Sequence, residues 1–208
     1  MGINSYEEMT SLQIDVMREI GSIGTGNAVT ALSSLMNIPV AMGMPTITIE
    51  GFNEAVETVG NPEDVVAAVM VAMGGDMSGI IMLVLDKDFI NEILSHTINQ
   101  QIADYDELDE MDISVLTEVG NIVISSYVSA MSGLAGMSIE LLVPAISVNM
   151  LGGIMSVPMA ELGYETDKLM MIQGSMRIES KKFDNDILMF PHIKSLNTLL
   201  DKLVGDHV

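Results

Sequence analysis

The first hundred residues alternate between stretches with the apolar spacing of a helix and continuous apolar runs typical of strands. Residues 14–36 carry apolar side chains three and four positions apart, which predicts one long helix. The segment PTITIE, which begins at Pro45, predicts a strand, and residues 65–86 predict a strand pair joined by a Gly-rich turn. A short helix over 89–98 completes this set of elements.

The second half of the chain repeats this order. IDV and EIGSI in the first half correspond to ISV and EVGNI in the second, and PTITIE corresponds to PAISVN, always at an offset of 99 residues. Chance matches would not hold one offset over such a length, so we interpret the pattern as an internal repeat. Residues 168–190 predict a second strand pair, with a longer and charged turn, and residues 193–204 predict its short helix.

This repeat predicts an α+β fold with a pseudo-two-fold axis. We expect one domain over residues 1–208, made of homologous halves at 10–103 and 109–206. Strands of the two halves should pair into one mostly antiparallel sheet, packed with the two long helices and with shorter ones. The acidic segment 104–112 lacks the glycine and the bidentate glutamate of an EF-hand loop, so we interpret it as a solvated connector. Asp112 is expected to be the N-cap of the next helix.

Charge limits the classes of partner. The chain has a formal net charge of −21, with only eight Lys and Arg. Phosphate backbones and anionic lipids would be repelled, so we expect no nucleic-acid binding and no membrane binding. Basic proteins, or proteins with a basic pocket, are the better candidates.

Other features of the composition favour a cytoplasmic protein. The absence of cysteine excludes disulfides, thiol nucleophiles and Cys-based metal sites. The first ten residues contain two glutamates and no basic segment, so no signal peptide is expected. The twenty methionines are either deformable core filler or part of a soft interaction surface.

Two polar triplets stand out within the long helices, at positions i, i+4 and i+7. They are Asp15, Glu19 and Ser22 in the first half and Ser114, Glu118 and Asn121 in the second. At 100° per residue each triplet forms one stripe on a helix face. A solvated helix face would explain one such stripe, but two at the same offset favour a function. Gly21 and Gly120 indicate close approach of another backbone, either between the two long helices or from a docked partner.

Two other kinds of chemistry are disfavoured. GSIGTGN at 21–27 resembles a dinucleotide-binding loop, but the preceding residues have helical spacing and the second copy lacks two of the glycines. His96, His192 and His207 have no partner at a spacing suited to a metal site or a catalytic triad, and we expect His96 and His192 at the surface or at helix ends. An enzyme with this sequence would act without its own metal and without a covalent nucleophile.

The motif copies resemble the CheC, CheX and FliY family. In that family an Asp or Ser is followed at i+4 by Glu, at i+7 by Asn and, after about 22 residues, by Pro. Ser114, Glu118, Asn121 and Pro144 fit this pattern completely, whereas the first copy has Ser22 in place of Asn. The resemblance covers roughly residues 10–205, and the chain length and two motif copies make it most similar to CheC.

The resemblance implies a phosphatase acting on the aspartyl-phosphate of a CheY-type response regulator in chemotaxis. The Mg²⁺ would be carried by the receiver, so the chain would need no cofactor. Asn121 would align a water molecule, and Glu118 would pair with the receiver lysine, as Glu19 would at the first site. Ser114 and Asp15 would assist docking. Ser22 is too short to hold the water.

The same resemblance implies further properties. CheD, a receptor-modifying deamidase, is expected as a second partner, and the chain is expected to be a monomer. The alternative function is a non-enzymatic adaptor of the chemotaxis or flagellar switch system that binds a receiver or CheD.

Overall fold

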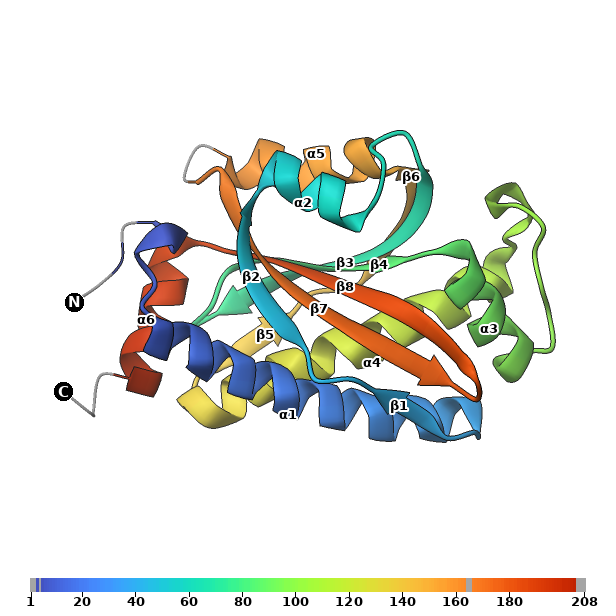
Figure 1. Cartoon of the computed structure of the whole chain (residues 1–208), viewed down its shortest axis with the longest axis horizontal. Helices are drawn as coiled ribbons and strands as arrows, with labels where there is room; N and C mark the ends of the chain where they lie inside the picture. Colours follow the sequence, from blue (N-terminus) through green and yellow to red (C-terminus); the bar gives the residue numbers. More distant parts are fainter. Residues whose placement is uncertain (1–2, 4, 164–165, 205–208) are drawn as a thin grey trace.

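The structure, a computed structural model, describes residues 3, 5–163 and 166–204, and in these the chain forms a layered α+β fold (Figure 1). An antiparallel sheet lies between two layers of helices. The helices are α1 (Ser11–Met36), α2 (Phe52–Val59), α3 (Lys87–Thr97), α4 (Glu110–Ala135), α5 (Leu151–Leu162) and α6 (Ile193–Val204), with short 3₁₀ turns at Tyr6–Glu8 and Tyr105–Glu107. The strands are β1 (Val40–Met42), β2 (Thr46–Gly51), β3 (Val65–Gly75), β4 (Gly79–Leu85), β5 (Ile139–Leu141), β6 (Ala145–Met150), β7 (Lys168–Ile178) and β8 (Lys181–Pro191).

The sheet is built by exchange between the two halves. Its order is β1-β7-β8-β4-β3-β5, with β2 also paired to β7 and β6 to β3. Thus β1 and β2 of the first half pair with the second half, while β5 and β6 pair with the first, and β4 pairs with β8 at the centre. All of these pairings are antiparallel, so the predicted fold class is confirmed.

Both faces of the sheet are covered. Val69, Ile81 and Ile187 face a core shared with α1, α4, α3 and α6. Ala68, Met82 and Leu188, their neighbours along the strands, face a second core under α2 and α5. Because adjacent strand residues point to opposite faces, a sheet buried on both sides is coded by continuous apolar runs rather than by alternation.

Both long helices begin with a capping box, and the two boxes are related by the repeat. In α1 the Thr10 hydroxyl accepts the Gln13 N–H at 3.3 Å, and the Gln13 side chain accepts the Thr10 N–H at 2.8 Å. In α4, Asp109 and Asp112 do the same at 2.9 and 3.1 Å. Asp109 is therefore the N-cap, and the prediction of Asp112 as the N-cap is wrong because that carboxylate closes the box from the third helical position.

The turn of the second strand pair also differs from the prediction. Only Glu179 and Ser180 join β7 to β8, with Glu179 in the left-handed region at φ 53°, whereas three residues separate β3 from β4. The charged residues expected in a long turn instead lie in the strands. They extend the β7–β8 hairpin beyond the end of β4, where paired backbone continues and side chains reach solvent.

Four elements were not predicted. The strands β1 and β5 are each three residues long, too short to show a period. The helix α5 contains Gly152, Gly153 and Pro158, which hide its helical character. The helix α2 has Phe52, Ala55, Val56 and Val59 at helical spacing, so the sequence does carry a pattern that indicates this helix.

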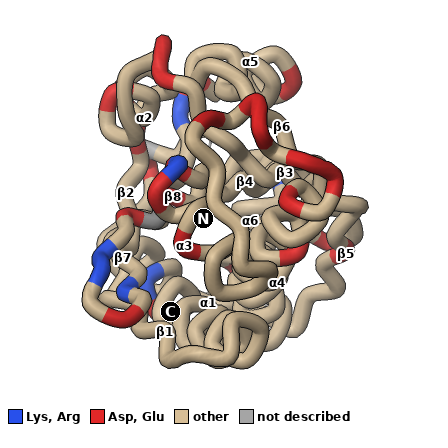
Figure 2. Tube along the Cα trace, turned by 90° about the vertical axis from the view of Figure 1, so that its right-hand side faces the viewer, with Lys and Arg blue, Asp and Glu red and all other residues tan. Residues whose placement is uncertain are grey.

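Charge is unevenly spread over this fold. Acidic residues are found over much of the surface, while Lys and Arg gather near β7 and β8 (Figure 2). Among the described helices, α4 has the length and apolar composition of a membrane span, and half of that stretch is buried inside the fold.

Candidate functional site

The two motif helices lie side by side on one face of the sheet and run in opposite directions (Figure 1). They approach closely where Gly24 of α1 meets Tyr127 of α4, since a Cβ on Gly24 would lie 2.9 Å from the Tyr127 Cα. The Tyr127 hydroxyl and the Thr25 hydroxyl are hydrogen-bonded at 2.8 Å in this buried contact. Burial raises the pKa of Tyr127, so the phenol stays protonated in the core.

The two motif glycines, Gly21 and Gly120, have neither of the two expected roles, which were contact between the long helices and docking of a partner. A Cβ on Gly21 would lie 3.2 Å from Pro45 Cγ, and one on Gly120 would lie 2.5 Å from Val69 Cβ. Both glycines therefore let a long helix press against the sheet layer, and neither marks the helix–helix contact or a partner site. In the first copy the motif proline, Pro45, thus packs on the motif glycine, whereas in the second copy Gly120 meets Val69.

The second triplet is open to solvent. Ser114 and Glu118 are exposed and Asn121 is half-buried at the side of α4. Within the described part of the chain, their side chains make no hydrogen bond and no ion pair. A carboxylate and an amide one turn apart are thus available to a partner that approaches this face.

The first triplet is partly engaged within its own half. The Asp15 carboxylate pairs with Arg18 Nη1 at 2.6 Å. The Ser22 hydroxyl donates to the Arg18 carbonyl oxygen at 3.0 Å, and Met44 Sδ lies 3.9 Å from the same hydroxyl. Glu19 is exposed. The equivalent faces of the two helices are therefore different: one presents a free amide, the other a hydroxyl turned back onto the helix.

Other parts of the surface offer less chemistry. The segment 21–27 lies inside α1, so it cannot be a dinucleotide-binding loop. A cavity of about 580 Å³ on the sheet face near α2 is lined by three carboxylates: Asp86, Asp184 and Asp186. Burial raises the pKa of Asp186, while the hydrogen bond from Gln173 at 3.0 Å opposes this shift. Its lining residues include no histidine and no residue of either motif helix.

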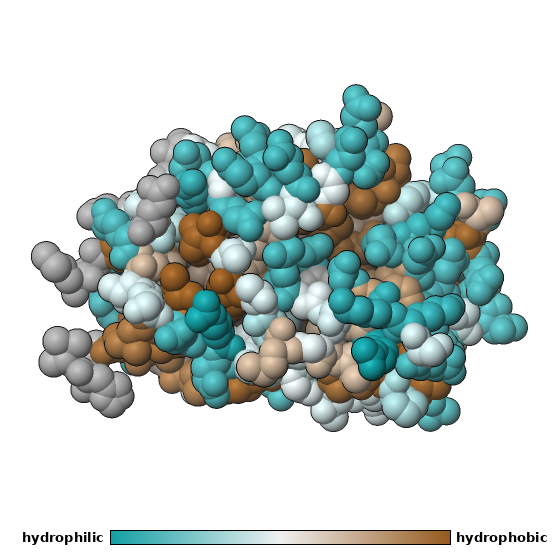
Figure 3. Space-filling model, viewed as in Figure 1, coloured by the Kyte–Doolittle hydropathy of each residue, from teal (hydrophilic) through white to brown (hydrophobic). Residues whose placement is uncertain are grey.

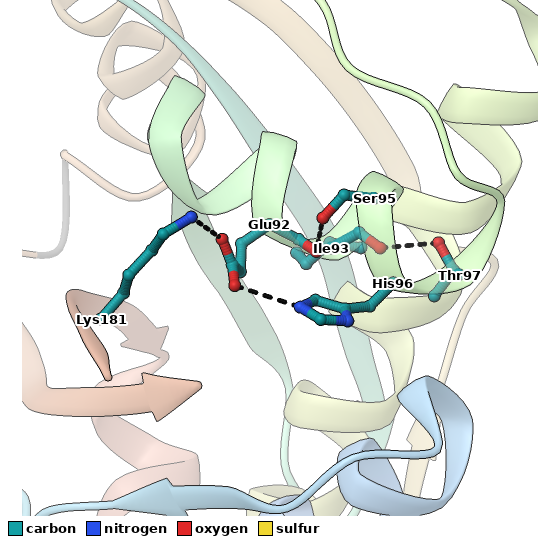
Figure 4. A network of polar contacts seen from close by, with 6 residues as sticks. All are labelled: Glu92, Ile93, Ser95, His96, Thr97 and Lys181. Atoms are coloured by element: carbon teal, nitrogen blue, oxygen red, sulfur yellow. Dashed lines mark hydrogen bonds and ion pairs between the residues drawn. The ribbon is translucent and has the colours of Figure 1, made fainter. Parts of the chain in front are cut away.

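His96 lies in the last turn of α3, as expected of a residue at a helix end, but the expectation that it has no suitably placed partner is wrong. Its Nε2 lies 3.2 Å from the buried Glu92 carboxylate, whose other oxygen accepts a hydrogen bond from Lys181 at 2.5 Å (Figure 4). Ligand atoms of Glu92, His96 and Glu179 lie within 4.8 Å of one another, a spacing that a metal could use. Because both Glu92 oxygens are already paired, we interpret this cluster as a link between α3 and the β7–β8 hairpin. His192 is half-buried before α6, and His207 lies outside the described residues.

Comparison with known proteins agrees with this fold and motif. The sequence profile of the CheC-like family matches residues 111–148, which include Ser114, Glu118, Asn121 and Pro144. The CheY-P phosphatase CheC of Bacillus subtilis is 29% identical over 182 residues, 86% of each chain.

Solved structures share the fold. FliY of Thermotoga maritima superposes with a TM-score of 0.74 at 22% identity, covering 94% of this chain and 99% of its own. CheX of Borrelia burgdorferi, in complex with CheY, BeF₃ and Mg²⁺, superposes with a TM-score of 0.53 at 16% identity, covering 81% and 96%. The middle domain of FliM from H. pylori gives a TM-score of 0.70 at 12% identity, covering 93% and 99%.

Fold and motif together are similar to those of CheC, CheX and FliY. The profile match and the alignment over most of both chains make the similarity to CheC extend beyond the fold. The resemblance inferred from the two motif copies is thereby confirmed.

Proposed function

We propose that the chain is a phosphatase that hydrolyses the aspartyl-phosphate of a CheY-type receiver. The observation that carries this proposal is the open stripe of Ser114, Glu118 and Asn121, which lies within the segment matched by the CheC-like profile. The B. subtilis relative is named a CheY-P phosphatase, and the CheX neighbour was solved in complex with CheY.

Hydrolysis of an aspartyl-phosphate requires few catalytic groups from the phosphatase. Water attacks phosphorus, the bond from phosphorus to the aspartyl oxygen breaks, and phosphate and a free carboxylate are released. The phosphoryl group is already activated, and the receiver, as substrate, supplies the Mg²⁺. The phosphatase therefore needs only to place the water and complete the electrostatics. This agrees with a site built from side chains of one helix, and the chain is proposed to need no cofactor of its own.

Each residue of the stripe has a role that its position allows. The Asn121 amide both donates and accepts hydrogen bonds, so it can hold a water in line with phosphorus. Glu118, one turn earlier on the exposed face, can pair with a receiver lysine. Ser114 lies one turn before Glu118 and extends the docking face. Asp15 and Glu19 are the corresponding docking groups of the first site, where Ser22 lacks the amide.

The direct test is phosphate release from a phosphorylated CheY-type receiver with and without this protein. We expect faster release with the wild-type chain and tighter binding to a beryllofluoride-activated, Mg²⁺-bound receiver than to the unphosphorylated form. Equal affinity for the two forms, together with unchanged phosphate release, would refute the proposal.

The second candidate is the non-enzymatic adaptor, which the FliM-like fold and the engaged first triplet favour. Binding of an activated receiver without accelerated phosphate release would select it. CheD as a partner and a monomeric state stay predictions of the resemblance, and a cytoplasmic location stays a prediction from the composition.

A further inference from the structure

Large apolar side chains are exposed at positions that the repeat relates to one another. Leu12 is 53% exposed and its counterpart Met111 is 60% exposed, while Met44 is 83% exposed and its counterpart Val143 is 89% exposed. Apolar residues reach the surface along the lower edge of the molecule, where α1 lies (Figure 3). Scattered exposed apolar residues are ordinary, but the same exposure at two pairs of equivalent positions points to a shared use.

Met111 and Met44 lie next to the polar stripes, and the repeat relates Leu142 and Val143 to the connection that carries Met44. Met111 precedes Ser114 by three residues and Glu118 by seven, so it lies on the same helix face one turn before the triplet. In the first half, Met44 contacts Ser22, and the adjacent Pro45 packs on Gly21. In the second half, Leu142 and Val143 form the equivalent connection between β5 and β6, and α4 packs against both of these strands.

We propose that Met111, Leu142 and Val143 form an apolar rim of the second site that contacts an apolar shoulder of the receiver beside its phosphorylated aspartate and its lysine. This inference rests on the proposed function and adds the chemistry of the docked surface. A rim that excludes water would strengthen a Glu118–lysine pair, because charges attract more strongly away from bulk solvent. It also supplies attraction that an acidic chain cannot obtain from charge alone.

The occupant is a receiver rather than a second copy of this chain. The rim is continuous with the stripe that carries the exposed Glu118, and a partner must therefore bring a cation to its centre. A second copy would bring another surface of a chain whose net charge is −21.

The two rims are unequal. Leu142 is 61% exposed in the second half, whereas the equivalent residue in the first half is Gly43. Met44 and Val143 are almost equally exposed, so the difference between the rims lies at Leu142 and Gly43. The larger rim thus belongs to the half that also has the water-aligning amide.

The test replaces the rim with small polar residues in the full chain. The double variant Leu142→Ser/Val143→Ser should weaken binding of a beryllofluoride-activated receiver and raise KM by about tenfold, with kcat unchanged, because loss of about 1.4 kcal/mol of binding free energy corresponds to tenfold in Kd. Val143→Leu should keep wild-type affinity. The matched control is Val157→Ser, the same kind of change at an exposed apolar residue of α5 on the other side of the sheet, which should change neither constant by more than about twofold.

The outcomes separate this inference from the proposed function. Unchanged Kd and KM in a double variant that keeps the wild-type Tm would overturn the rim while leaving the phosphatase intact. A weakened Kd in a chain without phosphatase activity would support the rim and overturn the enzyme. A wild-type dimer that dissociates in the double variant would identify a second copy as the occupant and overturn the rim's assignment to the receiver.

Discussion

At the scale of single residues, Asn121 and Ser22 occupy equivalent positions but present different groups. Asn121 is half-buried beside an exposed Glu118 and carries an amide with both a donor and an acceptor. Ser22 has a shorter side chain, and its hydroxyl donates to the Arg18 carbonyl oxygen of the same helix. In the proposed mechanism, a water molecule aimed at phosphorus would therefore have an amide partner in the second half and none at the equivalent position of the first.

The first prediction follows from this difference. Asn121→Ala should lower kcat for phosphate release about 10²–10³-fold, the usual effect of losing one aligned polar group in a transition state. Glu118→Ala should mainly raise KM, because it removes the pairing with the receiver lysine. Glu19→Ala is the matched control and should cost little activity. Near-full activity of Asn121→Ala, with loss of activity in Glu19→Ala, would place catalysis in the first half.

Sequence could predict the stripes but not the state of each side chain. The i, i+4, i+7 spacing is a property of any helix, so the shared face of Ser114, Glu118 and Asn121 follows from the sequence alone. The pairing of Asp15 with Arg18 and the approach of Met44 to Ser22 depend on rotamers and on a connection 22 residues away. The contact of Met44 with Ser22 appears only once the connection between β1 and β2 is placed against α1.

At the scale of elements, the space around the glycines of α4 indicates how closely that helix packs on the sheet. Gly120 faces Val69 of β3, and its hypothetical Cβ would lie 2.5 Å from the Val69 Cβ, which cannot move without its strand. Gly133, in the same helix, has no atom within 4 Å of the corresponding position. The same residue type is thus required by packing at one position and not at the other.

The second prediction uses this pair. Gly120→Ala should lower the free energy of unfolding by about 1–3 kcal/mol, since overpacking forces the helix away from the sheet. Gly133→Ala should raise it by about 0.5–1 kcal/mol, because alanine is the better helix former and meets no neighbour. Urea unfolding followed by circular dichroism measures both. Equal effects of the two changes would show that α4 does not press on β3.

The elements differ in how far the local sequence alone determines them. The two long helices and two strand pairs were predicted because long periodic or apolar runs leave few alternatives. The N-cap was placed three residues late because Asp109 and Asp112 both suit a helix start and only hydrogen-bond geometry separates them. The second turn was misjudged because Lys181, Lys182 and Asp184 look like loop residues, yet they occupy a hairpin end with one exposed face.

At the scale of the whole molecule, the excess of acidic groups leaves some carboxylates in unfavourable surroundings. Asp186 lies in the cavity near α2, and burial, together with the charges of Asp184, Glu50 and Asp86, raises its pKa. A raised carboxyl pKa means that the folded state binds more protons than the unfolded state between the ordinary value and the raised one. The stability of the fold therefore falls as pH rises through that window.

The third prediction is that Asp186→Asn stabilises the protein at neutral pH. The amide keeps an acceptor for Gln173 but removes the buried charge. A gain of about 1 kcal/mol would raise Tm by roughly 2–4 °C at pH 7, and the gain should shrink toward acid pH, where the native carboxyl is already protonated. Asp106→Asn, the same change at an exposed position, is the control. A gain that is independent of pH would rule out this explanation.

The pseudo-two-fold arrangement gives the last prediction, which concerns the number of receivers bound. Each triplet lies in the N-terminal part of its helix, and the antiparallel helices place these parts toward opposite ends of the pair (Figure 1). Two receivers would therefore not compete for one surface. The number of receivers bound depends on the affinity of each site. With Asp15 paired to Arg18, Ser22 turned back and Gly43 in place of an apolar residue, the first site should bind weakly.

Calorimetry with an activated receiver should give one tight site per chain, which Glu118→Ala removes and Glu19→Ala leaves. Ser22→Asn should restore an amide three residues after Glu19, raise phosphatase activity up to about twofold and bring a second binding event into range. Two equal sites in the wild-type chain would mean that the contacts around Ser22 do not close the first half, and that the asymmetry between the halves lies in catalysis alone.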